Sequence, residues 1–472
     1  MNFSLLLVEG IIGAWILVLL AADLWLPPAR KSGLWALAVG GILLAGGVLG
    51  WQRSAWLGET FQGIFLADRF AGYFKGLFLV TVGVVIVMTR SFQHHLDTRL
   101  GSFLLLLFTA LLGMLILASV NDLLLLFLGL ELLTFSLYLM VAYLKTDARS
   151  VEAGMKYLIL GSVSSGFLIY GVALLYGVAG STQFPVVQVA LSRGPIPLAA
   201  QAGMWLVLAG LGFKIAAVPF HLWVPDVYEG APTPVAALLA AGSKMAGVVA
   251  IIRVLAGVFP SMAGRWAGPF AILSAATMCY GNLAAIPQTN LKRLLGYSSI
   301  GHAGYLLMGL STASVAGVEA VAYYLLAYLF STLAVFLVVT VASDAVGGEQ
   351  LDDYRGLSKR SGLLAGAMFV GVLSLAGVPP LAGFAGKFLV LLATVDSGRL
   401  WLVAIGAINV AISLYYYLMV VKRMYLDAPR TPAAIPVSGV VKTLLVGLVL
   451  GILAIGIVQG PFLESIASVV GR

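Results

Sequence analysis

The chain has 472 residues, of which 61% are apolar and 10% are charged, and its mean hydropathy is +1.05. That much apolar surface is more than one water-soluble core can bury, so the composition excludes a soluble globular protein and indicates a polytopic membrane protein. The net charge of +8 is not concentrated in any basic run with interleaved aromatics, which excludes nucleic acid as a partner. A single cysteine, Cys279, excludes an internal disulfide or a cysteine-held metal or iron–sulfur site, and we expect no cofactor in this chain.

Apolar runs follow one another along the whole sequence. At 1.5 Å per residue, about 20 residues cross a hydrocarbon layer of ~30 Å as a helix. The runs therefore predict an all-α polytopic membrane protein with about fourteen transmembrane helices. We expect these spans at 3–26, 33–50, 67–89, 101–118, 122–144, 153–178, 198–220, 234–258, 266–286, 292–311, 314–342, 361–394, 399–424 and 441–463.

Basic residues in the connecting loops predict the orientation, because cytoplasmic loops carry an excess of lysine and arginine. The richer side holds Arg30, Lys31, Arg90, Arg99, Lys145, Arg149, Lys292, Arg293, Arg355, Lys359, Arg360, Lys422, Arg423, Arg430 and Lys442. The other side holds Arg53, Arg193, Arg265, Arg399 and Arg472. We therefore expect both termini on the periplasmic side.

Two spans contain matching breaks. Ala217-Val218-Pro219 lies in the seventh span and Gly377-Val378-Pro379-Pro380 in the twelfth, five helices later. Because helices an odd number of crossings apart run in opposite directions, the sequence predicts two inverted five-helix repeats, each with a discontinuous helix. Ordinary proline kinks are the alternative. The predicted single integral domain, 1–472, comprises three N-terminal helices (1–100), the two repeats (101–258 and 266–424) and a C-terminal helix (441–472).

Five ionisable residues are expected deep in the membrane: Glu131, Lys214, Lys244, His302 and Lys387. A charge facing lipid at the bilayer centre costs roughly 3 kcal/mol, so these side chains should line an internal polar axis. A carboxylate that moves relative to a buried lysine changes the proton affinity of that lysine, which favours proton movement. The alternative is a static buried ion pair that fixes helix packing.

Three further residues are weaker candidates for such an axis. His221 follows the first break, and a histidine there either relays protons or only forms an interhelical hydrogen bond, as is also true of His302. Lys292 and Lys156 lie near the cytoplasmic ends of their spans. They belong either to a proton uptake path or to side chains that extend to the membrane surface.

Four long stretches carry a family resemblance: LELLTFSLYLMVAYL, GFKIAAVPFHLWVPDVYEGAPTPVAALLAAGSKMAG, NLKRLLGYSSIGHAGYLLMGL and SLAGVPPLAGFAGKF. Between about residues 60 and 430 the chain resembles the antiporter-like membrane subunits of proton-pumping NADH:quinone oxidoreductase, respiratory complex I, and most closely the N-type members.

The resemblance implies fourteen helices, inverted repeats and proton translocation driven by quinone reduction elsewhere in the complex. It implies Glu131 and Lys214 as a coupling pair, Lys244 as a central relay and Lys387 towards the periplasmic exit. The implied partners are other membrane-arm subunits, some of them antiporter-like, in the lipid bilayer of a bacterial inner membrane. Flavin, iron–sulfur clusters and quinone are expected in those partners. A subunit of a multisubunit sodium/proton antiporter and a structural scaffold for a redox arm are the alternatives.

Overall fold

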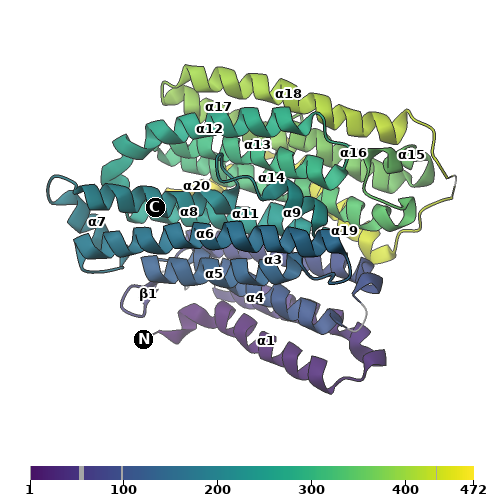
Figure 1. Cartoon of the computed structure of the whole chain (residues 1–472), viewed down its shortest axis with the longest axis horizontal. Helices are drawn as coiled ribbons and strands as arrows, with labels where there is room; N and C mark the ends of the chain where they lie inside the picture. The colour runs from purple at the N-terminus through teal and green to yellow at the C-terminus, as the bar shows by residue number, and fades with distance from the viewer. Residues whose placement is uncertain (1, 53–57, 97–98, 432, 472) are drawn as a thin grey trace.

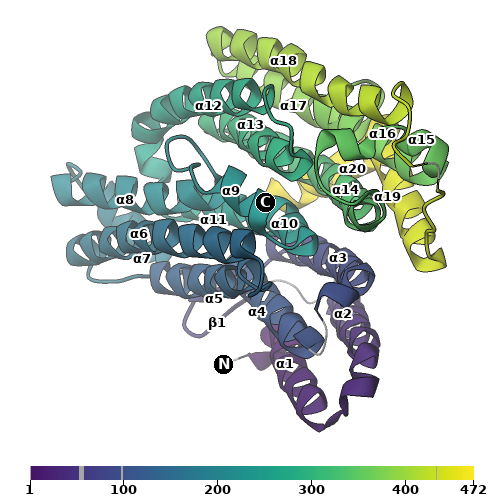
Figure 2. The same cartoon turned by 45° about the vertical axis from the view of Figure 1, so that its right-hand side comes forward.

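The computed structural model describes residues 2–52, 58–96, 99–431 and 433–471. Its helices share one long direction and form an elongated bundle (Figure 1). Helices α1 and α2 lie on one flank and α18 on the opposite flank (Figure 2). The predicted all-α membrane fold is confirmed. Arg53 and Arg472, two of the basic residues from which the orientation was predicted, lie outside the described residues.

The first half of the chain contains these elements: α1 Leu7–Trp25, α2 Leu34–Trp51, β1 Gly58–Thr60, β2 Phe65–Ala67, α3 Arg69–Ser91, α4 Leu100–Ala118, α5 Leu123–Val141, α6 Ala148–Ala179, α7 Phe184–Ser192, α8 Leu198–Ile215, α9 Val224–Gly230, α10 Thr233–Leu238 and α11 Lys244–Gly257. The second half contains α12 Ala263–Ala285, α13 Leu291–Ser311, α14 Val315–Val346, α15 Leu357–Arg360, α16 Gly362–Ala376, α17 Ala382–Asp396, α18 Leu400–Tyr425, α19 Gly439–Ile457 and α20 Gln459–Val470. Short 3-10 turns, η1 Phe3–Leu6, η2 Pro28–Gly33, η4 Gln93–His95, η7 Pro260–Met262 and η8 Leu351–Tyr354, and the π-helical turn η6 Leu239–Ser243 join some of them.

Eleven helical segments of the described ranges are long and apolar enough to cross a membrane. The other three predicted spans correspond to α12, α13 and the interrupted pair α16 and α17. The segment 233–257, which includes α10 and α11, is wholly buried over its most apolar stretch, and 89% of the most apolar stretch of α14 is buried. Helices that are apolar on every side belong in the interior of a bundle, so these two segments form its centre.

The chain leaves helical geometry at both predicted breaks, and it does so in the same way. Ala216 ends α8 with φ of 64°, and Gly377 ends α16 with φ of 89°. In each case the next amide reaches back to a carbonyl five residues earlier, at 2.9 Å from Ala217 and 3.0 Å from Val378. These bonds satisfy carbonyls that a helix end would otherwise leave unpaired within the membrane.

Other features also occur once in each half. Asp122, which caps α5, forms an isolated antiparallel bridge with Gln183, and Asn290, which caps α13, forms one with Gln350. Helices α6 and α14 follow α5 and α13, and each has 32 residues. Figure 1 places α7, which begins beside the first bridge, and α15, which follows the second, at opposite ends of the bundle.

Several boundaries differ from the sequence prediction. Helix α6 begins at Ala148, five residues before the predicted start, because Asp147 caps it by accepting a hydrogen bond from the Arg149 amide. The predicted last span, 441–463, is wrong: α19 ends at Ile457 and a separate helix, α20, follows. Pro461 lacks the amide that would continue α19. The β1–β2 hairpin and α7 are further elements that the prediction lacked.

Candidate functional site

The predicted axis begins at Lys214, in the last turn of α8. Its side chain is 3% exposed and donates a hydrogen bond of 2.8 Å to the hydroxyl of Thr134 on α5. Glu131 lies one turn earlier on α5, is half-buried, and accepts a short hydrogen bond from Ser165 of α6. Among the described residues, no contact within 4.0 Å joins Glu131 to Lys214. The two groups of the predicted coupling pair therefore form no direct ion pair, because Lys214 instead donates to Thr134, one turn beyond Glu131 on α5.

Lys244 lies at the centre of the bundle, directly after the π-helical turn 239–243. Its side chain is 2% exposed, and its ammonium donates hydrogen bonds to the carbonyl of Ser299 on α13 and, at 3.0 Å, to the hydroxyl of the same residue. The Ser299 hydroxyl in turn donates to Tyr228 on α9 at 3.3 Å. Short π-helical turns recur at functional sites, and this one sets the lysine against α13.

His302 lies on α13, one turn after Ser298. Its Nδ1 is 2.5 Å from the hydroxyl of Tyr324 on α14, and its Nε2 is 3.2 Å from the hydroxyl of Tyr417 on α18. The Tyr417 hydroxyl also forms a short hydrogen bond with Ser298. A neutral imidazole donates from one nitrogen and accepts at the other, so it can connect the two tyrosines in either direction.

Lys387 lies on α17, beyond the second break. Its ammonium is buried, at 3% exposure, and donates a hydrogen bond of 2.9 Å to the carbonyl of Ala376, the last residue of α16. It also stands 5.0 Å from the ring centroid of Tyr305. The carbonyl end of a helix and the face of an aromatic ring both favour a cation. The break in the helix thus provides the carbonyl partner of this buried charge, and α13 provides the aromatic ring.

Lys244, Lys387 and the polar groups between them come from five helices, α11, α13, α14, α17 and α18. Hydrogen bonds join Lys244 to Ser299 and, separately, join Ser298 through Tyr417 and His302 to Tyr324. These groups, together with Lys387, are called the polar series below. Among the described residues, no hydrogen bond joins Ser299 to Ser298 or Tyr324 to Lys387. Ser299 and Ser298 are neighbours in sequence, and α17 approaches Tyr324 so closely that a side chain at Gly386 would touch its ring. A cavity of about 10 Å³ beside Ser298 has room for about one water molecule.

The residues near the predicted cytoplasmic ends behave differently from one another. Lys292 is buried at 3% exposure, contacts Glu349 at 2.7 Å and donates to the carbonyl of Ala231. It therefore does not extend to the surface, and it lines a pocket of about 720 Å³. Lys156 is exposed and pairs with Asp226 at 2.6 Å, which places it on the surface.

His221 lies inside the first break, where its ring stacks edge-on against Tyr280 with 4.2 Å between centroids. Within the described residues, no hydrogen bond joins His221 to the polar groups between Lys244 and Lys387. His302 therefore belongs to the polar series, and His221 does not.

Sequence reasoning missed several polar partners. Tyr324, Tyr417 and Thr134 sit in apolar helices, where one hydroxyl carries no distinguishing signal. A second buried ion pair, Lys75 with Glu9 at 2.6 Å, joins α3 to α1. Here a signal was present, because a lysine within the predicted span 67–89 needs a partner away from lipid.

The family of the chain follows from its relatives. A family model described as NADH:quinone oxidoreductase/Mrp antiporter, TM, matches residues 119–413, more than half of the chain. NADH-quinone oxidoreductase subunit N of Desulforamulus reducens is 41% identical over 470 residues, which are 98% of this chain and 97% of that protein. The chain belongs to the NADH-quinone oxidoreductase subunit N family. The resemblance given by the sequence motifs is thereby confirmed.

Solved structures contain chains of the same fold. A chain of respiratory complex I from Thermus thermophilus with bound Aureothin has a TM-score of 0.83 and 32% identity, over 97% of this chain and 98% of that one. A chain of the Mrp complex from Dietzia has a TM-score of 0.86 over 99% of this chain and 98% of that one. At 20% identity it shows the shared fold alone. The prediction of an integral membrane subunit of an oxidoreductase, a translocase, is confirmed.

Proposed function

We propose that this chain translocates protons through its buried Glu131, lysine and His302 groups in the membrane arm of a complex I-type NADH:quinone oxidoreductase. The observation that carries the proposal is the polar series, a set of buried polar groups between Lys244 and Lys387 that come from five apolar helices. Such a series is costly to bury and is retained where ions or protons pass. Membership in the subunit N family supports the same function.

The chemistry of the groups suits proton transfer. Serine and tyrosine hydroxyls and a neutral imidazole can each accept a proton on one side and release one on the other. A buried lysine exchanges its proton when the charge near it changes. Glu131, close to Lys214, would supply that change, Lys244 would act as the central relay, and Lys387 would deliver protons towards the periplasmic exit. The pocket at Lys292 and Glu349 would admit protons from the cytoplasm.

The inverted-repeat architecture is part of this proposal, with repeats at 101–258 and 266–424. The matched helix ends at Ala216 and Gly377 support it, as do the paired bridges Asp122 with Gln183 and Asn290 with Gln350. Discontinuous helices in inverted repeats accompany ion sites near the membrane midplane. Lys214 and Lys387, each beside one of the breaks, fit that pattern.

The partners and cofactors follow from the family. The relative from Thermus thermophilus is a chain of respiratory complex I, so other membrane-arm subunits, including antiporter-like ones, would flank this chain. Flavin, iron–sulfur clusters and quinone would be bound by partner subunits. A sodium/proton antiporter subunit is the second candidate, since the Mrp chain shares the fold.

The two candidates predict different assemblies. Purification of the tagged chain from its own membranes should recover flavin-containing and iron–sulfur subunits together with it. Gel electrophoresis, metal analysis and flavin fluorescence measure this. Recovery of small antiporter subunits alone would support the sodium/proton antiporter.

Both termini should lie on the periplasmic side of a bacterial inner membrane. The loop charges motivate this expectation, and Arg90 at the end of α3 stacks on the ring of Trp35 at the start of α2, 3.9 Å from its centroid, so these two helix ends lie together as the predicted orientation requires. Cysteine tags placed at the two chain ends of a Cys279→Ser protein should react with a membrane-impermeant reagent in whole cells whose outer membrane is permeabilised. Labelling of either tag only after disruption of the inner membrane would refute the orientation.

A further inference from the structure

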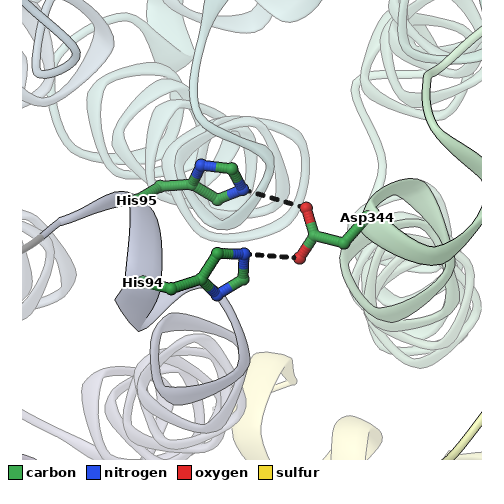
Figure 3. A group of neighbouring side chains, drawn as sticks. All are labelled: His94, His95 and Asp344. Atoms are coloured by element: carbon green, nitrogen blue, oxygen red, sulfur yellow. Dashed lines mark hydrogen bonds and ion pairs between the residues drawn. The ribbon is translucent and has the colours of Figure 1, made fainter.

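The 3-10 turn Gln93–His95, which follows α3, meets the end of α14 through three side chains. His94 Nε2 lies 3.1 Å from one carboxylate oxygen of Asp344, and His95 Nε2 lies 2.9 Å from the other. Figure 3 shows both imidazole rings turned towards this carboxylate from the same short segment. The two histidines are neighbours in sequence, whereas Asp344 lies 249 positions after His95, so the fold brings the carboxylate to the histidine pair.

We propose that His94, His95 and Asp344 form a binding site for Zn²⁺ or a similar divalent transition metal ion. Two imidazole nitrogens and one carboxylate oxygen are a ligand set that Zn²⁺ accepts, with water in the fourth position. Bonds of about 2.0–2.2 Å in a tetrahedral site place ligand atoms roughly 3.3 Å apart. The observed separations need only small side-chain adjustments, because the three ligand atoms already lie within 4.8 Å of one another.

The protons of the site can be accounted for. A neutral histidine that donates from Nε2 to the carboxylate must free the lone pair of that nitrogen before it binds a metal ion. Moving the proton to Nδ1 achieves this without release of a proton, and the exposure of His94 and His95 lets water accept from Nδ1. The exposed position also gives dissolved ions direct access.

The proposed metal site lies at the pocket that contains Lys292. His95 and Asp344 line the same pocket of about 720 Å³ as Lys292 and Glu349. An ion bound there would hold the end of α3 to the end of α14 at the mouth of that pocket. Metal binding itself does not depend on proton translocation, so its test is independent of the proposed function.

Zinc binding to the purified complex tests the site. Complex stripped with a chelator and dialysed against ZnCl₂ should bind one more Zn²⁺ per copy of this chain than complex carrying His94→Gln and His95→Gln together. Asp344→Asn should weaken that site by more than the roughly 10–100-fold that follows the loss of an outer-shell partner. With Co²⁺ in place of Zn²⁺, the visible bands of a four-coordinate ion should appear in the native complex and be absent from the double-histidine complex.

Asp147→Asn is the matched control. Asp147 lines the same pocket but does not belong to the group of three candidate ligands, and asparagine caps α6 as well as aspartate does. This variant should bind zinc as the native complex does. Equal zinc stoichiometry and affinity in native, double-histidine and Asp344→Asn complexes, each verified as assembled, would overturn the proposal.

Discussion

Complex that carries Lys387→Met should assemble and lose proton translocation by at least about tenfold, given that a positioned proton-transfer group typically contributes 10²–10⁴-fold. Methionine has a similar unbranched apolar stem and fills most of the space beside Tyr305 without a charge. The carbonyl of Ala376 would lose its donor, which affects stability modestly. Proton uptake by vesicles containing equal amounts of assembled complex measures the effect.

Lys387→Arg separates proton exchange from charge. Arginine keeps the positive charge but stays protonated in proteins, so it should also lose translocation. If the charge served only to hold α17 against the end of α16, arginine would restore function and methionine would cause loss of assembly. Wild-type translocation by the arginine variant would therefore remove Lys387 from the proton path.

Glu131→Gln should slow pumping-linked turnover by lowering the proton affinity of Lys214, while the Ser165 hydroxyl still has an acceptor at position 131. Lys214→Met should slow it as well. Because Lys214 is hydrogen-bonded to Thr134, one turn from Glu131, the double variant should be hardly slower than the slower single variant. Residues that act as one unit give such non-additive effects, which a double-mutant cycle on proton translocation measures.

The control cycle replaces Lys214→Met by Lys442→Met. Lys442 is an exposed residue of α19, and distant independent sites combine additively. Additivity of Glu131→Gln with Lys214→Met, to the same degree as in the control cycle, would contradict coupling between the two residues.

The helices were predictable from the sequence because the membrane imposes a simple rule: about 20 apolar residues for every crossing. The breaks were visible because proline cannot donate an amide hydrogen bond. Pro461, in the first turn of α20, could in the same way have indicated that α19 ends just before it, but the apolar run continues to Leu463 and hid this boundary. The strands β1 and β2 have three residues each, too few for a periodic pattern.

The site was only partly predictable. Buried lysines can be recognised in the sequence, since charges in apolar spans are rare. Their partners do not: Tyr324 and Tyr417 differ from other aromatic residues of their helices only in what they face, which depends on packing between distant segments. The sequence left open whether Lys292 is buried or extends to the membrane surface. Its ion-pair partner, Glu349, follows α14 and so belongs to a different segment of the chain.

The ratio of protons translocated to quinone reduced tests the central claim most directly. It is measured in vesicles containing native complex, the Lys387→Arg complex or the control Lys442→Met complex, each normalised for assembly. Proton passage through this chain predicts a lower ratio, or slower turnover at the native ratio where the two are tightly coupled, for Lys387→Arg only. A native ratio together with native turnover in the Lys387→Arg complex would contradict the account.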